Sequence, residues 1–463
     1  MPRGQGGTLS GFTPLSTPNA PTDLSVSTSI GSASVSFTAP SDTGDAAVTS
    51  YIVTAIDEST GASTGATGSS SPISISPGGG TFKIRAQAVN GFGPGRLTEF
   101  STGNAVFSGA ELYAWGTNSF GSIGDNTTVN RSSPVQVGLL TTWSQVTAGN
   151  PHTNAVKTDG TLWSWGRNNV GQLGLNTTVN QSSPVQVGAL TNWLKISTRS
   201  VHAIAIKVEG TLWAWGDGTS GKLGDGTVVD RSSPVQIGAL TNWSQVSTGD
   251  SHTAAVTTGG QLYAWGAGGS GQLGGGTTVS KSSPVQIGAL TTWSQVSGGG
   301  NHTAAVKTNG TLWAWGQNGY GHLGDNTVVY KSSPVQIGAL TSWAQVSAGG
   351  AHTTAVKTDG TFWAWGRNFS GELGDGTVIL RSSPVQIGAL TNWAQADVSA
   401  GGGHTTAIKT DGTFWAWGFN NNGQLGDSTV VNRSSPVQVG ALTTWAQASA
   451  GGGTHTTALE GVI

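Results

Sequence analysis

The sequence predicts an all-β protein, with a small β-sandwich followed by a seven-bladed β-propeller. A segment of fifty residues is copied along the last three-quarters of the chain, and a Trp-Gly pair marks it seven times. Each copy holds short apolar runs between turn residues, without a sustained helical period. All 19 tryptophans lie after residue 110, so the first hundred residues must have a different core. The Trp-Gly pairs begin at Trp115, Trp165, Trp215, Trp265, Trp315, Trp365 and Trp417.

Composition argues against several classes of protein. Only 9% of the 463 residues are charged and the net charge is −2, so no basic cluster is present that could neutralise a run of phosphates. We therefore expect no nucleic-acid partner. The chain has no cysteine, which removes disulfides and thiolate chemistry. Because neither a signal peptide nor a run of membrane-spanning length is evident, we expect folding in the cytosol and no membrane insertion.

Three regions follow one another. Residues 1–18 are expected to form a flexible or partner-ordered tail, because they are rich in Gly, Ser, Thr and Pro without periodicity. Residues 19–103 contain short alternating runs typical of an antiparallel sandwich. Their segments APTDLSV, VSFTAP, YIVTAID and FKIRAQAVNGFGPG resemble a fibronectin type III module, a family of spacer or docking domains, with Phe82 where that family carries a tyrosine. Residues 104–463 are predicted to form the propeller.

Each repeat is predicted to supply four short strands, which is the size of one propeller blade. In KTDGTLWAWG, two strands flank an Asp-Gly or related pair such as Asp159-Gly160, a hairpin signal for a turn with positive φ at both central residues. A second strand pair is expected from SSPVQIG and WSQVSAG across a Gly-Ala-Leu-Thr turn. Every tryptophan lies at a repeat position, so we expect core packing, with each indole N–H offered to a partner.

Closure of the ring requires one more strand beside Leu112–Trp115. The C-terminal segment HTTALEGVI aligns with HTTAVKTDG of the complete repeats, so we expect Thr456–Glu460 to supply that strand. Ala105–Phe107 is the alternative, and it would otherwise be a linker.

The pattern W-G-x-N-x-x-G-Q-L-G-D-G-T, then S-P-V and V-S-A-G-x-x-H-T-x-A-V-x-x-D-G, resembles the regulator of chromosome condensation repeat over residues 111–463. That resemblance implies a seven-bladed propeller. Family members act in guanine-nucleotide exchange, chromatin docking or inhibition of a secreted β-lactamase. Exchange depends on an inserted β-wedge, for which the blade spacing leaves no room, and chromatin docking depends on basic tails that are absent. We therefore expect the fold to carry over without these activities.

Histidine and aspartate each recur at one repeat position. A circle of histidines could bind metal, but tetrahedral zinc does not select a seven-fold ring, so we expect each to bond backbone of its own or a neighbouring blade. The Leu-Gly-Asp carboxylates are too far apart for acid–base pairs. With no catalytic motif present, we expect no enzymatic activity, cofactor or metal. The structural histidines are His152, His202, His252, His302, His352, His404 and His455.

The framework is nearly identical between repeats, whereas the loop after each Trp-Gly and the residue before the Arg or Lys of the T-V-x-R turn vary. Propellers bind partners through such rims, and aromatic and arginine side chains are enriched in interfaces. Neutral drift after recent duplication is the alternative explanation. The candidate binding-rim residues are Phe120, Arg167, Tyr320, Tyr330, Arg367, Phe369, Leu380 and Phe419.

The combination of spacer sandwich and propeller resembles bacteriophage virion proteins of tail fibres, baseplates or decorations. This interpretation predicts a non-enzymatic structural and adhesive protein, located in the virion after folding in the host cytoplasm and release by lysis. The tail and sandwich would bind other virion proteins in an oligomeric assembly, and a propeller rim would face a host surface protein or glycan. An extracellular or cell-surface location is the alternative. The alternative function is a soluble protein-binding propeller, either an enzyme inhibitor or an exchange-factor-like scaffold, and a lectin is a third hypothesis.

Overall fold

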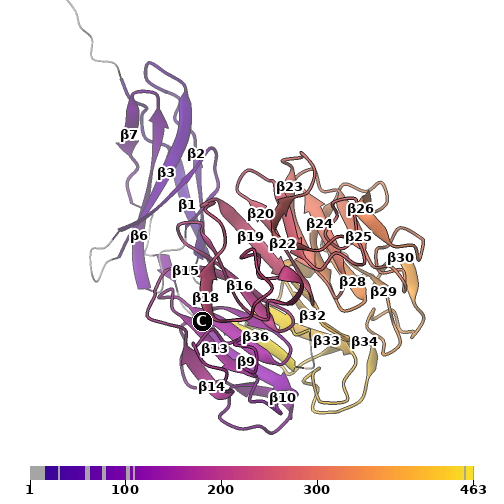
Figure 1. Cartoon of the computed structure of the whole chain (residues 1–463). Helices are drawn as coiled ribbons and strands as arrows, with labels where there is room; N and C mark the ends of the chain where they lie inside the picture. The colour runs from indigo at the N-terminus through magenta and orange to yellow at the C-terminus, as the bar shows by residue number, and fades with distance from the viewer. Residues whose placement is uncertain are drawn as a thin grey trace, which may run out of the picture. The chain divides into compact units, whose positions relative to one another are not determined.

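The computed structural model describes residues 16–29, 32–57, 63–75, 80–100, 105–107, 110–452 and 455–461. It divides into two compact units, Met1–Ser108 and Gly109–Ile463 (Figure 1). The described elements are β-strands, apart from one 3₁₀ turn at Thr219–Gly221. Within these residues there is no helix long and apolar enough to span a membrane. The protein is therefore all-β, as predicted.

The first unit consists of two antiparallel sheets around one core. Inward-facing residues alternate with outward-facing ones, so that Val35 and Phe37 on one sheet and Val53 and Ile84 on the other are buried together. This is the two-layer arrangement expected for an antiparallel sandwich, while its fibronectin type III family stays a prediction. One sheet has the order β1 (Thr22–Ser29), β2 (Ser32–Thr38), β5 (Ile73–Ile75). The other has the order β4 (Ser63–Gly68), β3 (Val48–Asp57), β6 (Gly80–Asn90), β7 (Gly93–Leu97), with β8 (Ala105–Phe107) also on β6.

The buried Asn90 side chain fastens one end of this unit. Its amide donates hydrogen bonds to the carbonyls of Thr43 and Ser16, at 2.9 and 3.2 Å. Ser16 in turn donates its backbone N–H to the Asp45 carboxylate at 2.6 Å. Ser16 and Pro18, which belong to the predicted tail 1–18, accept backbone hydrogen bonds from Asp45 and Arg96 of the first unit, both at 3.1 Å. Residues 1–15 lie outside the described residues, and for them the tail stays a prediction.

The second unit is built from four-stranded antiparallel blades with one strand order, and the described residues form seven of them. Five are separate sheets, and two meet in an eight-stranded sheet through the pair Trp143–Ala110. Blades 1 to 3 are β11 (Trp143–Ala148), β12 (His152–Lys157), β13 (Leu162–Gly166), β14 (Gln181–Gln186); β15 (Trp193–Thr198), β16 (His202–Lys207), β17 (Leu212–Gly216), β18 (Arg231–Gln236); and β19 (Trp243–Thr248), β20 (His252–Thr257), β21 (Leu262–Gly266), β22 (Lys281–Gln286). Blades 4 to 6 are β23 (Trp293–Gly298), β24 (His302–Lys307), β25 (Leu312–Gly316), β26 (Lys331–Gln336); β27 (Trp343–Ala348), β28 (His352–Lys357), β29 (Phe362–Gly366), β30 (Arg381–Gln386); and β31 (Trp393–Ala400), β32 (His404–Lys409), β33 (Phe414–Gly418), β34 (Arg433–Gln438). Blade 7 is β35 (Trp445–Ala450), β36 (His455–Gly461), β9 (Ala110–Gly116), β10 (Arg131–Gln136).

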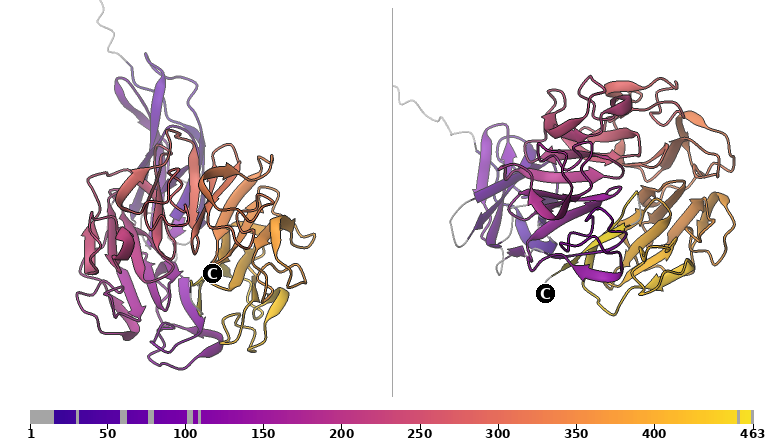
Figure 2. Two further views of the ribbon diagram at one scale, coloured as in Figure 1. Left: turned by 45° about the vertical axis from the view of Figure 1, so that its right-hand side comes forward. Right: turned by 60° about the horizontal axis from the view of Figure 1, so that its bottom comes forward.

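Blade 7 closes the ring with strands from both ends of the unit (Figures 1 and 2). β36 pairs with β9 along its whole length, with Thr456 opposite Trp115 and Glu460 opposite Glu111. This confirms the prediction that Thr456–Glu460 supplies the closing strand. Ala105–Phe107, the alternative, pairs instead with β6 of the first unit.

One strand pairing predicted from the repeat is wrong. The SSPVQ and WSQVS segments do not pair with each other: the first is the outer strand of one blade and the second is the inner strand of the next. The Gly-Ala-Leu-Thr segment therefore crosses between blades. The proline of each outer strand, such as Pro184 in β14, lies where the register with β13 shifts, between the pairs Ser164–Val185 and Gly166–Gln181.

Hydroxyl groups join the inner strands around the ring. In every blade the Ser or Thr of the V-S-A segment accepts a hydrogen bond of 2.9 to 3.2 Å from a backbone N–H of the next inner strand. These bonds satisfy strand edges that no ladder reaches. The acceptor and donor pairs are Thr147 with Thr198, Ser197 with Thr248, Ser247 with Gly298, Ser297 with Ala348, Ser347 with Ala400, Ser399 with Ala450, and Ser449 with Ala148.

The tryptophans form the core between blades, but not every indole N–H has a partner. Trp165 is fully buried and donates to the Ser122 carbonyl of the preceding blade at 3.0 Å. Gly124 lies against that indole with φ +86°, where a Cβ would come within 2.6 Å of the indole nitrogen. The T-x-W tryptophans differ from this pattern, since Nε1 of Trp143 and its six equivalents has no partner among the described residues. Each of their rings instead contacts further aromatic rings, as Trp143 contacts Trp163 edge to face and Trp165 in a tilted arrangement.

The hairpin of blade 1 also differs from the prediction in its turn. Gly160 has φ +75°, whereas Asp159 keeps a negative φ, so only one central residue is left-handed. The Asp159 carboxylate explains this, because it accepts hydrogen bonds from both N–H and O–H of Thr161, at 2.9 and 2.7 Å. The Thr161 hydroxyl in turn accepts the indole N–H of Trp163 at 2.8 Å. The turn is thus a tight turn closed by glycine, and it also positions the tryptophan.

Candidate binding face

The blade topology places all the candidate rim residues at one end of the propeller. Strands alternate in direction, so the turn after each inner strand and the loop after each Trp-Gly lie at the same end. We call this end the upper face. The Asp-Gly hairpins and the Gly-Ala-Leu-Thr connections lie at the opposite end, which we call the lower face.

A buried asparagine supports most of the variable loops. Asn118 is fully buried, and its side-chain oxygen accepts the N–H of Ile123 at 2.9 Å while its amide donates to the Thr127 carbonyl at 3.0 Å. Sequence analysis treated the whole stretch after Trp-Gly as variable, whereas this second position is a structural one. Its equivalents are Asn168, Asn318, Asn368 and Asn420.

The Leu-Gly-Asp aspartates are structural ion-pair partners. Asp125 accepts hydrogen bonds from the Thr127 hydroxyl at 2.6 Å and from the Arg131 guanidinium at 2.6 and 2.8 Å. Burial raises the pKa of Asp125, but the hydrogen bonds from Thr127 and Arg131 outweigh it and hold the pKa below its usual value. Where Leu175 replaces the aspartate, Gln181 replaces the arginine.

The structure brings four of the predicted rim residues together in two pairs. Tyr320 and Phe369, from the loops of blades 4 and 5, make an edge-to-face contact with ring centroids 5.6 Å apart. The Arg167 guanidinium of blade 1 lies 5.2 Å from the ring of Phe120 in blade 7.

The other four rim residues lie in the loops of blades 4 to 6. Tyr330 is exposed and accepts a hydrogen bond from the Gln317 amide at 3.2 Å. Arg367 is half-buried between the Glu372 carboxylate at 2.9 Å and the Gly402 carbonyl at 3.2 Å. Leu380 is exposed and Phe419 is half-buried.

Sequence analysis missed a second apolar element of the upper face. A β-branched side chain precedes the variable T-V-x-R position in every blade, and 56 to 63% of its surface is exposed. Exposed apolar residues recurring around a whole face are characteristic of contact surfaces. The signal was present in the sequence as a valine at a turn position, where a polar residue is usual. These residues are Val129, Val179, Val229, Val279, Val329, Ile379 and Val431.

The seven repeat histidines are fully buried and link each blade to the next. His302 shares a hydrogen bond of 2.9 Å with the Thr353 hydroxyl, which itself donates to the His322 carbonyl at 2.7 Å. The hydroxyl proton is therefore used, so Nε2 of His302 must carry the hydrogen. The observed partner is a neighbouring hydroxyl, where backbone was expected. The other pairs are His152 with Thr198, His202 with Thr253, His252 with Thr303, His352 with Thr405, His404 with Thr456, and His455 with Thr153.

Burial keeps these histidines neutral. It lowers the pKa of His152, His252 and His404 to about 3 and that of His455 to about 4. The positive charge of Arg199 adds to the effect at His252. Among the described residues, no three His, Asp or Glu side chains gather as a metal site would require.

Arg199 is a buried charged residue that sequence analysis overlooked. It lies in the turn after the inner strand of blade 2, where the six other repeats carry glycine. Its guanidinium donates to the carbonyls of Ala348 and Ala400 at 3.1 and 3.2 Å, and to the Asp250 carboxylate at 3.0 Å. The side chain therefore joins blade 2 to blade 3 and to blades 5 and 6. A charged residue in a position that is otherwise glycine was the available signal.

Models of known protein families match the propeller repeats. Residues 228–458 match the RCC1-like domain model, and residues 110–156 and 159–206 match the regulator of chromosome condensation (RCC1) repeat. A search of curated proteins finds no match.

Similar solved structures cover the propeller. Human WBSCR16 has a TM-score of 0.68 and 21% identity over 76% of this chain and 99% of its own. Prp20p from Saccharomyces cerevisiae, described with its binding to Gsp1p and histones, has a TM-score of 0.68 and 20% identity over 77% of this chain and 92% of its own. Yeast RCC1 (Prp20) bound by Kap60 has a TM-score of 0.68 and 19% identity over 76% of this chain and 89% of its own. The repeats, their blade order and these matches together show that the second unit of this chain is an RCC1-like repeat propeller.

Proposed function

We propose that this chain is a protein-binding propeller that holds a partner protein on its upper face, through the loops of blades 4 to 6. The contact between Tyr320 and Phe369 carries this proposal. The two rings come from different blades and meet edge to face, yet 38% and 61% of their surfaces remain exposed. Aromatic side chains fixed in this way are typical anchors of protein interfaces.

Other residues enlarge this candidate surface. Arg367 is fixed beside it by Glu372 and Gly402, so little conformational entropy is lost when its guanidinium contacts a partner. The exposed Val329 and Ile379 lie in blades 4 and 5, the blades that carry Tyr320 and Phe369. An interface built on a repeated framework can vary these side chains without changing the blade.

The similar structures favour this function over the virion interpretation. Prp20p is described with the proteins Gsp1p and histones, and yeast RCC1 with Kap60. The virion, tail-fibre and adhesin interpretation receives no support from them, so the soluble protein-binding alternative is the one we adopt. As part of the proposal, the first unit is a fibronectin type III-like spacer or docking module, supported by its sheet orders β1-β2-β5 and β4-β3-β6-β7.

The test compares two faces of the propeller. Partners captured by the purified chain from cells that express it would be identified, and their dissociation constants measured with purified proteins. Tyr320→Ser combined with Phe369→Ser should weaken binding at least tenfold, in line with about 2 kcal/mol or more for an interface anchor. Leu290→Ser combined with Leu340→Ser, which changes equally exposed apolar residues of the lower face, is the matched control. Equal losses in both double variants, or none in the first, would contradict the proposal.

A further inference from the structure

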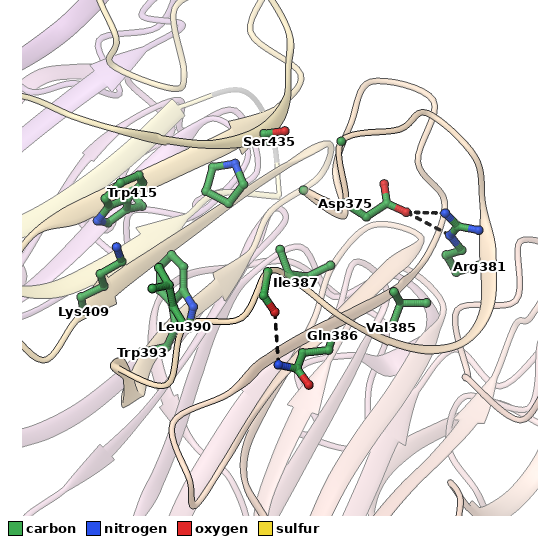
Figure 3. Close-up of a pocket in the computed structure, with 14 residues that line it drawn as sticks. Asp375, Arg381, Val385, Gln386, Ile387, Leu390, Trp393, Lys409, Trp415 and Ser435 are labelled. Carbon is green, nitrogen blue, oxygen red and sulfur yellow. Dashed lines mark hydrogen bonds and ion pairs between the residues drawn. The ribbon is translucent and has the colours of Figure 1, made fainter.

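A groove with a volume of about 530 Å³ runs between blades 5 and 6 on the outside of the ring. We call it the lateral groove (Figure 3). Blade 5 contributes Val385 and Ile387 from the end of β30, and blade 6 contributes Trp393, Lys409 and Trp415. This volume lies within the range of small-molecule sites, which is roughly 300 to 1,000 Å³.

Lys409 is a charged group of the lateral groove, and no carboxylate of the described residues pairs with it. Only 8% of its surface is exposed, and its ammonium group lies 3.8 Å from the centroid of the Trp415 ring and 5.2 Å from that of Trp393 (Figure 3). Its ammonium group makes no hydrogen bond or ion pair with any described residue. The Asp411 carboxylate, which weakly opposes the lowering of the Lys409 pKa by burial, is engaged by Thr413 at 2.6 and 3.0 Å.

The other lining residues of the lateral groove indicate which kind of ligand could pair with the Lys409 ammonium group. The other charged groups of the lining, Asp375 and Arg381, neutralise each other through two hydrogen bonds of 2.8 and 2.9 Å. Val385, Ile387 and Leu390 give the lining an apolar wall, and Gln386, whose amide donates to the Gly388 carbonyl at 3.1 Å, and Ser435 are its uncharged polar side chains. The lining therefore offers one uncompensated positive charge and a long apolar wall. A buried cation is stabilised when an anion of good geometry joins it.

Blade 6 shares its lysine with other blades but differs from them in its inner strand. In four other blades the lysine Nζ lies 3.7 Å from the centroid of the equivalent third-strand tryptophan ring, as with Lys157, Lys207, Lys307 and Lys357. In blade 6 alone the inner strand is two residues longer: five positions separate Trp393, opposite Lys409, from Val398, opposite Ala407. In blade 5 the equivalent residues Trp343 and Val346, opposite Lys357 and Ala355, are three positions apart. The insertion thus lies next to the wall that Trp393 forms.

We propose that the lateral groove between blades 5 and 6 binds a small molecule that carries a single carboxylate on an apolar body. Lys409 binds the carboxylate, and Val385, Ile387 and Leu390 contact the apolar part. This site is distinct from the upper face, so it does not depend on the proposed protein-binding function.

The first experiment is calorimetric titration of the full chain with phenylacetate. Phenylacetamide, which has nearly the same shape without the charge, and acetate, which lacks the apolar body, are the matched probes. We expect saturable binding of phenylacetate at one site, with both other probes at least tenfold weaker. Lack of saturation, or equal binding of the amide, would overturn the proposal.

Variants then locate the site. Lys409→Met removes the charge, and Lys409→Thr reproduces the residue that blade 3 carries as Thr257, so the blade should still form. Both should weaken phenylacetate binding at least tenfold, whereas Lys357→Met, which removes the equivalent cation of blade 5, should not.

Leu390→Glu gives an independent check that leaves the Lys–Trp contacts in place. Leu390 is half exposed at the groove, so a carboxylate there should compete with the ligand for Lys409 and also weaken binding at least tenfold. Unchanged binding in Lys409→Thr and Leu390→Glu, or an equal loss in Lys357→Met, would show that the groove is not the site.

Discussion

A residue that departs from the repeat pattern can make contacts that the other blades lack. Arg199 takes the place of a glycine and bonds carbonyls of two blades, while Asp250 on the next blade balances its charge. Charged donors form stronger hydrogen bonds than neutral ones, and a buried guanidinium is costly unless it is fully paired. The contacts of Arg199 meet this requirement, and we therefore regard it as a cross-ring link.

We predict that Arg199→Gly, which restores the residue of the other repeats, destabilises the propeller by about 2 kcal/mol, the usual contribution of a charge-assisted hydrogen bond. The measurement is the urea midpoint of unfolding. Arg199→Met keeps the side-chain volume without the donors and should behave similarly. Arg167→Met on the exposed upper face is the control and should leave the midpoint unchanged, and an unchanged midpoint in Arg199→Gly would refute the link.

The lysines over tryptophan pairs are a second feature at this scale. Five blades pair a lysine of the second strand with a tryptophan of the third, whereas the two blades with Tyr113 and Tyr263 carry Glu460 and Thr257 at the lysine position. The lysine stem covers apolar surface while its charge interacts with both rings. The two positions thus change together, because the lysine and the larger indole stabilise each other.

At the scale of the element, a short side-chain relay connects the hairpin to its blade in five of the seven blades. In blade 4, Asn309 accepts hydrogen bonds from Thr311, whose hydroxyl accepts the indole N–H of Trp313 at 2.9 Å. The relay satisfies a turn, a hydroxyl and an indole at once. It explains why Asp-Gly-Thr-x-Trp recurs as a unit, beyond the turn signal itself.

Thr311→Val should therefore destabilise the chain by about 1 to 2 kcal/mol, because it removes one hydrogen bond and leaves the Trp313 N–H without a protein partner. Thermal unfolding is a suitable measurement. The same change at Thr278, which is exposed in the turn before β22, supplies the comparison. A similar small effect at both positions would mean that the relay contributes nothing.

At the scale of the molecule, the ring depends on contacts that exist only once it has closed. The hydroxyl of Ser449 accepts the N–H of Ala148, and His455 is hydrogen-bonded to Thr153, across more than 300 residues of sequence. Removing residues 455–463 should leave β9 with an open edge and break both links. We expect loss of a single cooperative calorimetric transition together with concentration-dependent association. Retention of one sharp transition by this truncated chain would contradict the prediction.

The buried histidines make the whole ring sensitive to acid. Their pKa values in the folded state are lowered, so between pH 6.5 and about 4 the unfolded chain binds protons that the folded chain does not. Stability therefore falls as the pH falls through this range, and it is fully present above pH 6.5. At pH 5 each histidine with a folded pKa near 3 should cost about 2 kcal/mol.

The free energy of unfolding, measured from pH 7 to pH 4.5, tests this linkage. His404→Gln retains an N–H donor toward Thr456 and removes one titrating group. The slope of its unfolding free energy against pH should be smaller than that of the unchanged chain, by the amount that corresponds to nearly one bound proton. An identical pH dependence in this variant and the unchanged chain would rule out the histidines as its cause.

The sequence by itself determined the repeat, the all-β class, four strands per blade and the closing strand, because these follow from periodicity and local turn chemistry. It also placed the candidate rim residues on loops. It could not decide that SSPVQ and WSQVS lie in different blades, since strand pairing depends on which edges remain free after folding. Only the tertiary structure brought Tyr320 to Phe369, Arg199 to Ala400 and Lys409 to the lateral groove. Such contacts join residues far apart in the chain, and nothing local in the sequence encodes them.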